Sequence, residues 1–199
     1  MKVTRGHGLL EGFLARKRAE MADKLIPSEL RKGRILDIGC GTYPFFLFNT
    51  GFSEKYGLDK AVQESEFENL EKDRIHLKRC NVEQEGILPF DDGFFDVVTM
   101  LAVFEHIEPK RLVGLLKEIH RVLKPGGMFI MTTPASWTDG LLRLMARLRL
   151  VSPVEIEEHK DIYTPQKIAS ILETGGFPKE LIRYGYFECF MNIWLTACL

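Results

Sequence analysis

Short apolar runs alternate along the chain with longer segments whose apolar residues recur at helical spacing. Runs bounded by turn residues are typical of buried strands, and the longer segments are typical of helices that cover a sheet. We predict strands at 34–38, 55–58, 75–77, 94–100 and 128–133, with two more between 181 and 199. We predict helices over 8–26, 45–48, 112–123, 137–151 and 165–173. The alternation predicts an α/β fold with a largely parallel sheet.

The first predicted strand ends in a glycine turn, Gly39-Cys40-Gly41. Glycine can adopt positive φ there, and its missing Cβ lets a ligand approach the backbone. Asp59 ends the next strand twenty residues after Gly39, a spacing that suits a carboxylate accepting a ribose hydroxyl. Pro44 stands where a dinucleotide fingerprint has its third glycine, and Asp37 would repel phosphate but attract a cation. The pattern favours a ligand with a ribose, an adenine and a positive centre, without phosphate.

Three stretches resemble the class I S-adenosylmethionine-dependent methyltransferases of the small-molecule and lipid type. Residues Arg34–Thr42, RILDIGCGT, match the first motif of that family, hhDhGCGxG, with Tyr43 in place of its last glycine. Leu88–Ile107, LPFDDGFFDVVTMLAVFEHI, matches a second family pattern, and Glu118–Pro134, EIHRVLKPGGMFIMTTP, matches a third. The resemblance implies a single three-layer, Rossmann-like domain over residues 1–199. Its sheet would have seven strands, mostly parallel with an antiparallel C-terminal strand, and helices on both faces.

The same resemblance implies S-adenosylmethionine as the cofactor. It places around that cofactor a set of residues from the ends of the first four strands: Asp37, Gly39, Cys40, Gly41, Asp59, Lys60, Asn81, Val82, Leu101 and Ala102. Asn81 would meet the adenine amino group, because an amide both donates to and accepts from a purine edge. The alternative is a loop asparagine that bonds to its own backbone. Leu101, Ala102 and Val103 would pack along the cofactor.

The methyl group of this cofactor is already activated by a cationic sulfur, so the main task of the protein is to align the acceptor in a dry pocket. A general base is needed only if the acceptor must lose a proton. His106 is the first candidate for that role and His159 the second, with Glu105 and Tyr163 behind them. The resemblance places His159 and Tyr163 on the acceptor side. The alternative for His106 is a structural histidine that anchors the following helix.

Two segments are predicted to cover the acceptor. Residues 1–30 would form a helical cap from which His7 or Arg16 faces the acceptor, and the alternative is a solvated charge cluster. Residues 135–163, which depart from the strand–helix alternation, would form a lid with interleaved apolar and basic positions. Such a helix suits an anionic or lipid-linked acceptor, or a membrane surface. The interpretation that we favour is a helix packed on the core with its arginines in solvent.

Composition excludes several other classes of protein. The 199 residues are 45% hydrophobic, which suits one full-sized core, and 27 basic residues nearly balance 28 acidic ones. No global positive field would therefore recruit nucleic acid. The first residues lack the apolar core of a signal peptide and no uncharged apolar run could span a bilayer, so we expect a cytoplasmic protein. The four cysteines form no C-x-x-C pair, and the acidic run Glu155–Asp161 is more typical of a solvated loop, so we expect no metal site.

We therefore predict an enzyme that transfers a methyl group from S-adenosylmethionine to a small-molecule, lipid or glycan-intermediate acceptor. Residues Met100–Glu105 lack the Asn/Asp-Pro-Pro-aromatic turn of enzymes that methylate the amino groups of bases. Two alternatives keep the fold. One is an aminopropyltransferase, which needs an acidic pocket after the fourth strand where this chain is apolar, and the other is a catalytically silent cofactor-binding or scaffold protein. A nicotinamide-dependent reductase is a third alternative, against which Pro44 argues.

Overall fold

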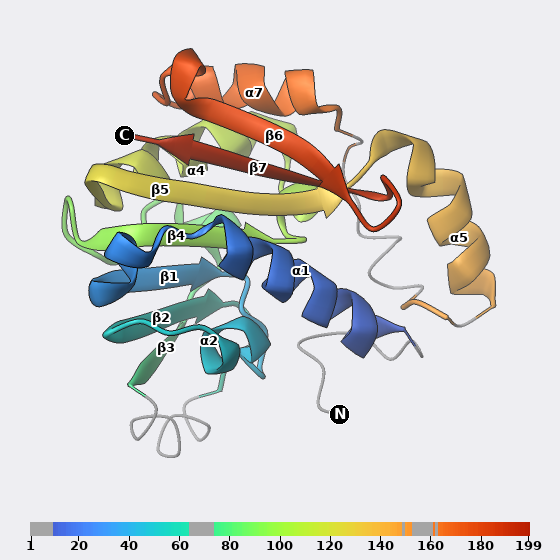
Figure 1. The fold of residues 1–199 in the computed structure, drawn as a ribbon, viewed down its shortest axis with the longest axis horizontal. Helices are drawn as coiled ribbons and strands as arrows, with labels where there is room; N and C mark the ends of the chain where they lie inside the picture. Colours follow the sequence, from blue (N-terminus) through green and yellow to red (C-terminus); the bar gives the residue numbers. More distant parts are fainter. Residues whose placement is uncertain (1–9, 64–73, 149, 153–160, 162) are drawn as a thin grey trace.

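The computed structural model describes residues 10–63, 74–148, 150–152, 161 and 163–199. Within them, seven strands form one sheet in the order β3-β2-β1-β4-β5-β7-β6 (Figure 1). The strands are β1 (Arg34–Ile38), β2 (Glu54–Asp59), β3 (Ile75–Arg79), β4 (Phe95–Leu101), β5 (Leu123–Pro134), β6 (Ile182–Phe187) and β7 (Asn192–Cys198). β7 runs antiparallel to both of its neighbours, and the other pairs are parallel. The predicted sheet, mostly parallel with an antiparallel C-terminal strand, is confirmed.

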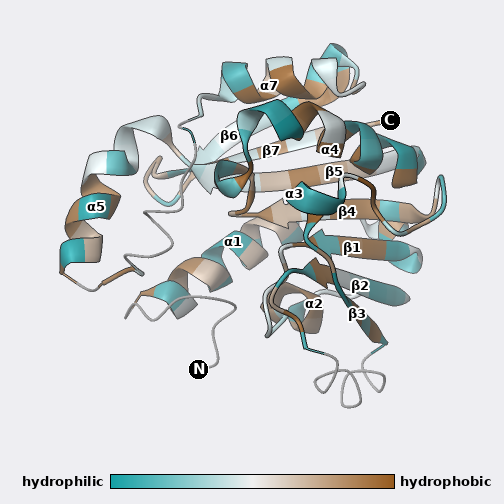
Figure 2. Ribbon diagram, turned by 180° about the vertical axis from the view of Figure 1, so that it is seen from behind, coloured by the Kyte–Doolittle hydropathy of each residue, from teal (hydrophilic) through white to brown (hydrophobic). Residues whose placement is uncertain are grey.

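Helices cover both faces of the sheet, as predicted. α1 (Glu11–Leu25) and α2 (Phe45–Asn49) lie on one face, and α3 (Val82–Glu85), α4 (Pro109–Val122) and α7 (Pro165–Thr174) lie on the other (Figures 1 and 2). α5 (Asp139–Arg147) lies beyond the carboxyl ends of the parallel strands (Figure 1). In the part of the chain that the structure describes, no helix combines the length and the apolar composition needed to cross a membrane.

Successive residues of the central strands face opposite layers. Ile35 and Val97 belong to a buried cluster with residues of α1 and α2, whereas Leu36 and Val98 belong to a cluster with residues of α4 and α7. This follows from the two-residue period of a strand, which sends neighbouring side chains to opposite faces. The core therefore lies on both sides of β1 and β4, which explains why these strands are almost continuously apolar.

The register of the central strands decides where a ligand can bind. Ile38 at the end of β1 pairs with Leu58 of β2 on one side and with Met100 of β4 on the other. The next residues along these three strands, Gly39, Asp59 and Leu101, therefore lie side by side at the carboxyl edge of the sheet. A parallel sheet binds its ligands at this carboxyl edge, where the strand order reverses.

Several predicted elements differ from the observed ones in extent. In the structure, the helix predicted over 8–26 spans Glu11–Leu25, and the helix predicted over 112–123 already begins at Pro109. Proline is accommodated there because the first turn of a helix does not use its backbone N–H groups. β5 follows α4 directly, because Leu123 pairs with Phe95 before the register of the two strands shifts.

The helix predicted over 137–151 is shorter than expected. Residues Ser136–Thr138 form a separate 3-10 turn, and α5 ends at Arg147. The carbonyl of Leu150 accepts a hydrogen bond from the backbone N–H of Leu10 (2.9 Å), and buried Val151 packs beside α5. The chain after α5 thus binds to the start of α1, which ends the helix.

We predict opposite effects for two glycine-to-alanine substitutions. A Cβ on Gly33 would lie 1.9 Å from the Asp96 carboxylate, which accepts hydrogen bonds from the backbone N–H of Arg34 (2.8 Å) and from Lys124 (2.6 Å). Gly33→Ala should therefore lower the free energy of unfolding by about 1–3 kcal/mol. Gly114 is exposed within α4, and a Cβ there meets open space. Gly114→Ala should therefore raise the free energy of unfolding by up to about 1 kcal/mol. Urea denaturation measures both, and a shift in the same direction for the two variants would contradict this packing.

Candidate active site

The glycine turn after β1 is fixed by its neighbours on β2 and β4. Gly39 and Gly41 have φ of 79° and 72°, in the region that favours glycine. The N–H of Gly39 donates to the carbonyl of Leu58 (2.7 Å), and the N–H of Gly41 donates to the Asp59 carboxylate (3.0 Å). A Cβ on Gly39 would come within 2.3 Å of the Val103 side chain. Both predicted glycines are therefore required by the backbone, and Gly39 is also required by packing.

A first pocket opens at this turn and comprises about 440 Å³ of space, part of it open to solvent. We call it the cofactor pocket because predicted cofactor residues line it. Five of the predicted cofactor residues line it: Gly39, Asp59, Lys60, Asn81 and Val82. Asp59 is buried, and its second carboxylate oxygen accepts a hydrogen bond from the N–H of Ala61 (2.8 Å). Residues not singled out from the sequence also line the pocket, among them Cys80 and Ile107. The end of β2 and the segment after β3 thus meet around one cavity.

Asp37 and Cys40 lie behind the turn rather than in the described lining of the pockets. The Thr99 hydroxyl of β4 donates to the Asp37 carboxylate (2.7 Å), and burial, with a smaller contribution from the charge of Asp59, raises the pKa of Asp37 to about 7. The sulfur of Cys40 points into the core, because a Cβ on Gly57 would come within 2.7 Å of it. The spacing of residues in the sequence does not reveal which side chains of a turn point into a cavity. The sequence prediction therefore placed Asp37 and Cys40 among the residues that contact the cofactor.

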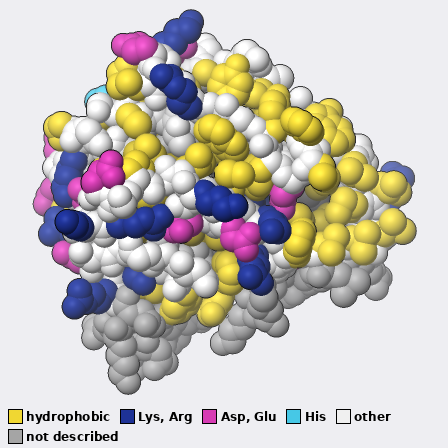
Figure 3. Space-filling model, in the orientation of Figure 1, with side chains coloured by type: hydrophobic (Ala, Val, Ile, Leu, Met, Phe, Trp, Pro, Cys, Tyr) yellow, Lys and Arg dark blue, Asp and Glu magenta, His cyan; other side chains and the backbone are white. Residues whose placement is uncertain are grey.

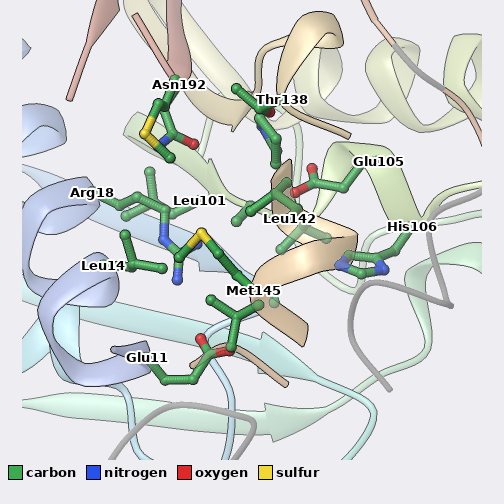
Figure 4. A pocket seen from close by; sticks show the side chains of 16 residues that line it. Glu11, Leu14, Arg18, Leu101, Glu105, His106, Thr138, Leu142, Met145 and Asn192 are labelled. Carbon is green, nitrogen blue, oxygen red and sulfur yellow. The ribbon is translucent and has the colours of Figure 1, made fainter. Parts of the chain in front are cut away.

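A second pocket adjoins the first and comprises about 900 Å³ of space, part of it open to solvent (Figure 4). We call it the acceptor pocket because the two segments predicted to cover the acceptor contribute to its lining. It shares Gly39, Val103 and His106 with the cofactor pocket, so the two cavities meet at these three residues. Predicted cofactor residues Leu101 and Ala102 line it at the end of β4. Its remaining walls come from α1, α5 and the start of β7.

The backbone turns sharply at Ala102, which lines the acceptor pocket. Ala102 has φ of 55°, a left-handed conformation that costs a non-glycine residue roughly 1–2 kcal/mol. Its N–H donates to the carbonyl of Thr132 on β5 (2.9 Å), which holds the turn in place. Backbone strain of this kind is concentrated at functional sites, where the surrounding structure maintains it.

The four candidate proton acceptors have different surroundings. His106 is partly exposed where the pockets meet, and Glu105 is only 3% exposed and accepts a hydrogen bond from the Thr133 hydroxyl (3.0 Å). Tyr163 lies in a smaller adjoining pocket that Glu105 also lines. Burial, followed by the charges of Asp161 and Glu105, raises the pKa of Tyr163 to about 12, so its hydroxyl keeps its proton at neutral pH. His159 lies outside the described residues.

Arg18, rather than Arg16, faces the acceptor pocket from the N-terminal helix (Figure 4). Arg16 is exposed and forms an ion pair with Glu20 (2.9 Å). Arg16 and Arg18 are two positions apart, and two positions along a helix rotate the side-chain direction by about 200°. The two arginines therefore face nearly opposite ways. The cluster Arg16–Arg18 was visible in the sequence, but its orientation depends on how α1 packs. His7 lies outside the described residues.

Two further polar residues of the acceptor pocket, Glu11 and Asn192, were missed by sequence reasoning. Glu11 accepts a hydrogen bond from the backbone N–H of Ser152 (2.8 Å), and the Asn192 amide donates to Glu188. No sequence pattern links these positions, which only the tertiary fold brings together. Within the described ranges, no three His, Cys, Asp or Glu side chains are grouped so that they could hold a metal ion. The acidic run at 155–160 lies outside those ranges.

Comparisons with known proteins agree with this geometry. A family model for a methyltransferase domain matches residues 36–131, from β1 to β5. The sterol 4-C-methyltransferase strm-1 of Caenorhabditis elegans is 35% identical over 125 residues, which are 61% of this chain and 36% of that protein. The demethylmenaquinone methyltransferase of Staphylococcus haemolyticus is 28% identical over 173 residues, 75% of this chain and 70% of that protein. A solved S-adenosylmethionine-dependent methyltransferase from Archaeoglobus fulgidus has a TM-score of 0.67 at 18% identity, covering 95% of this chain and 94% of that one.

Residues 36–131 thus carry the pattern of a methyltransferase domain, on a fold shared with solved S-adenosylmethionine-dependent methyltransferases. The chain spans 36% to 50% of the length of the first four curated relatives that it matches. The span matched by the family model contains the glycine turn, Asp59, Asn81 and His106. In contrast, α1, α5 and β7, which contribute to the lining of the second pocket, lie outside that span.

The donor set of the cofactor pocket fits S-adenosylmethionine, the cofactor of this family. The Asp59 carboxylate lines the cavity, where a negative charge suits the cationic sulfonium compound and opposes a pyrophosphate. Asp59 is also a hydrogen-bond acceptor, and Asn81 lines the cavity as an amide able to donate and accept. The protein would hold the cofactor with these groups.

We predict that Asp37 makes the stability of the protein depend on pH. The pKa of Asp37 is about 7 in the folded state against an ordinary value of 3.8. Its contribution to stability is therefore fully present below about pH 4 and is lost as the pH rises through 7. Asp37→Asn keeps an oxygen for the Thr99 hydroxyl and removes the titration. The variant should become more stable relative to the wild type as the pH rises from 5 to 8.

Urea denaturation at several pH values measures this difference, with Asp91→Asn as an exposed control. A difference between wild type and Asp37→Asn that is the same at pH 5 and pH 8 would refute the assignment.

Proposed function

We propose that the protein transfers the methyl group of S-adenosylmethionine to an oxygen or carbon nucleophile of a small, predominantly apolar acceptor. The observation that carries this proposal is the junction of the two pockets at Gly39, Val103 and His106. A methyl transfer needs two ligands whose reacting atoms meet at one point away from bulk water. Two curated relatives are named for a sterol and for demethylmenaquinone, which supports an apolar ring compound as acceptor.

On the cofactor side, Asp59 would accept hydrogen bonds from ribose hydroxyls, and Asn81 and Val82 would contact the adenine. The cofactor supplies a methyl group on a cationic sulfur, which makes the group electrophilic without help from the protein. Gly39 lets the ligand approach the backbone, since a larger residue there would meet Val103. The role of these residues is to orient the methyl group toward the acceptor pocket.

On the acceptor side, His106 would accept a proton from an acceptor hydroxyl, because it is the titratable side chain that lines both pockets and lies at their junction. Glu105, held by the Thr133 hydroxyl, would orient the polar end of the acceptor. Leu14 of α1, with Leu142 and Met145 of α5, would exclude water from the other walls. In this proposal, the segments 1–30 and 135–163 act as cap and lid of the acceptor.

The test is transfer of a tritiated methyl group from S-adenosylmethionine to a panel of phenols and hydroquinones. We expect His106→Gln to lower kcat by about 10²- to 10⁴-fold on acceptors that lose a proton, because a general base contributes about that factor. The affinity for S-adenosylhomocysteine should stay within about twofold, since the substitution leaves the cofactor donors intact.

His76→Gln is the matched control, because His76 is exposed on β3 and outside the lining of both pockets among the described residues. An unchanged kcat in His106→Gln would remove this histidine from the mechanism. Tight cofactor binding without transfer to any member of the panel would instead favour a protein that binds the cofactor without turnover.

A further inference from the structure

A large apolar groove opens beside the acceptor pocket, between α1, α5 and the turn that joins β6 to β7. It encloses about 1260 Å³ of empty space, part of it open to solvent, and its outer part is lined by Phe13, Met21, Leu141 and Phe187. Figure 3 shows apolar side chains gathered over the region of α5. Neither the cofactor nor the head of a small acceptor, as assigned above, occupies this groove.

The groove adjoins the acceptor pocket. Leu14, Met145 and Met191 line both cavities, so these three apolar side chains form a common wall. Two of the three are methionines, which are unbranched and adapt their shape readily. A chain attached to a ligand in the acceptor pocket therefore has a short apolar route to the groove.

The groove walls remain exposed although they are strongly apolar. Phe13 is 56% exposed, and Phe190 in the adjacent turn is 68% exposed. Contiguous exposed apolar surface marks a binding site for an apolar partner. The charged residues that line the groove among the described ones are two lysines and two glutamates, Lys17, Glu20, Lys24 and Glu188. Because these charges balance, and Lys17 pairs with Glu20 (3.0 Å), the groove suits an uncharged chain better than an anionic surface.

We propose that this groove binds the hydrocarbon chain of the methyl acceptor, an inference that rests on the proposed function. The acceptor is then an amphipathic molecule whose reactive polar head occupies the acceptor pocket. Its chain passes between Leu14, Met145 and Met191 and lies along α1 and α5. The groove adds to the specificity of the site, because the groove selects acceptors by their hydrocarbon chain and the acceptor pocket selects them by their polar head.

Methionine methyl groups report directly on each part of this path. The chain has seven methionines, of which Met21 lies only in the groove, while Met145 and Met191 lie in the shared wall. Met100 and Met131 are fully buried in the sheet and serve as internal controls. The measurement is NMR of the methionine methyl groups, labelled with carbon-13, in protein saturated with S-adenosylhomocysteine. Phenol should shift the methyl signals of Met145 and Met191 alone. 4-Hexylphenol should shift Met21 as well, and neither should shift the controls.

Affinity provides a second, independent readout. The Kd of 4-alkylphenols should fall by roughly three- to fourfold per added methylene, as expected for burial of an apolar chain. Leu141→Asp should flatten this dependence and leave the affinity for phenol unchanged. Leu181→Asp is the matched control, because Leu181 is exposed to 40% against 38% for Leu141 and lies away from the groove.

The outcomes separate this inference from the proposed function. A protein that binds S-adenosylhomocysteine but shows no Met21 shift and no chain-length dependence would overturn the groove assignment alone. Failure to bind S-adenosylhomocysteine would overturn the proposed function. Two other results would also overturn the inference, provided that the Met21 signal does not shift with 4-hexylphenol. Flotation with vesicles that is lost in Leu141→Asp would assign the face to a membrane. Self-association in sedimentation that is lost in Leu141→Asp would assign it to a second copy of the chain.

Discussion

The hydrogen bond from the Gly41 N–H to the Asp59 carboxylate ties the turn after β1 to the end of β2. It forms because parallel pairing brings Ile38 level with Leu58, so the two strands leave the sheet together. The same register on the other side of β1 places the end of β4 beside the turn. The cofactor pocket, the strained Ala102 and the junction with the acceptor pocket all depend on this alignment.

Two acids, Asp37 and Asp59, lie at this edge of the sheet. Asp37 is buried under the turn, where its desolvation disfavours the charged form, although the Thr99 hydroxyl donates a hydrogen bond to its side chain. A buried carboxyl group whose pKa is raised in the folded state weakens the fold at neutral pH. A cation bound above the turn would favour the charged form of Asp37. The protein thus retains, at the edge of the sheet that is predicted to bind the cofactor, a buried acid that would destabilise an ordinary core.

The cofactor side could be predicted from the sequence because its determinants are local. The glycine turn, Asp59 and Asn81 each follow a strand, and the parallel sheet places the ends of adjacent strands together. Cys40 shows the limit of this reasoning, because whether a turn side chain points into a cavity or into the core depends on neighbours such as Gly57. Gly39 could be predicted for its backbone, but its contact with Val103 required the structure.

The acceptor side could not be predicted in the same way because it is assembled from distant segments. Glu11 and Asn192 line one pocket although almost the whole chain separates them. Arg18 faces that pocket while its neighbour Arg16 faces solvent, which depends on how α1 packs against the sheet and α5. The helix predicted over 137–151 ended early because the chain after it binds to α1. Long-range packing therefore determines which residues line this pocket.

The most direct test of this account is calorimetric titration of the protein with S-adenosylhomocysteine and, separately, with NAD. The account predicts binding of the first ligand alone, retained in the exposed control Asp91→Ala and weakened by roughly 10- to 100-fold in Asp59→Ala, which loses charged hydrogen bonds. Equal affinity for NAD, or binding of S-adenosylhomocysteine that is unchanged in Asp59→Ala, would contradict it.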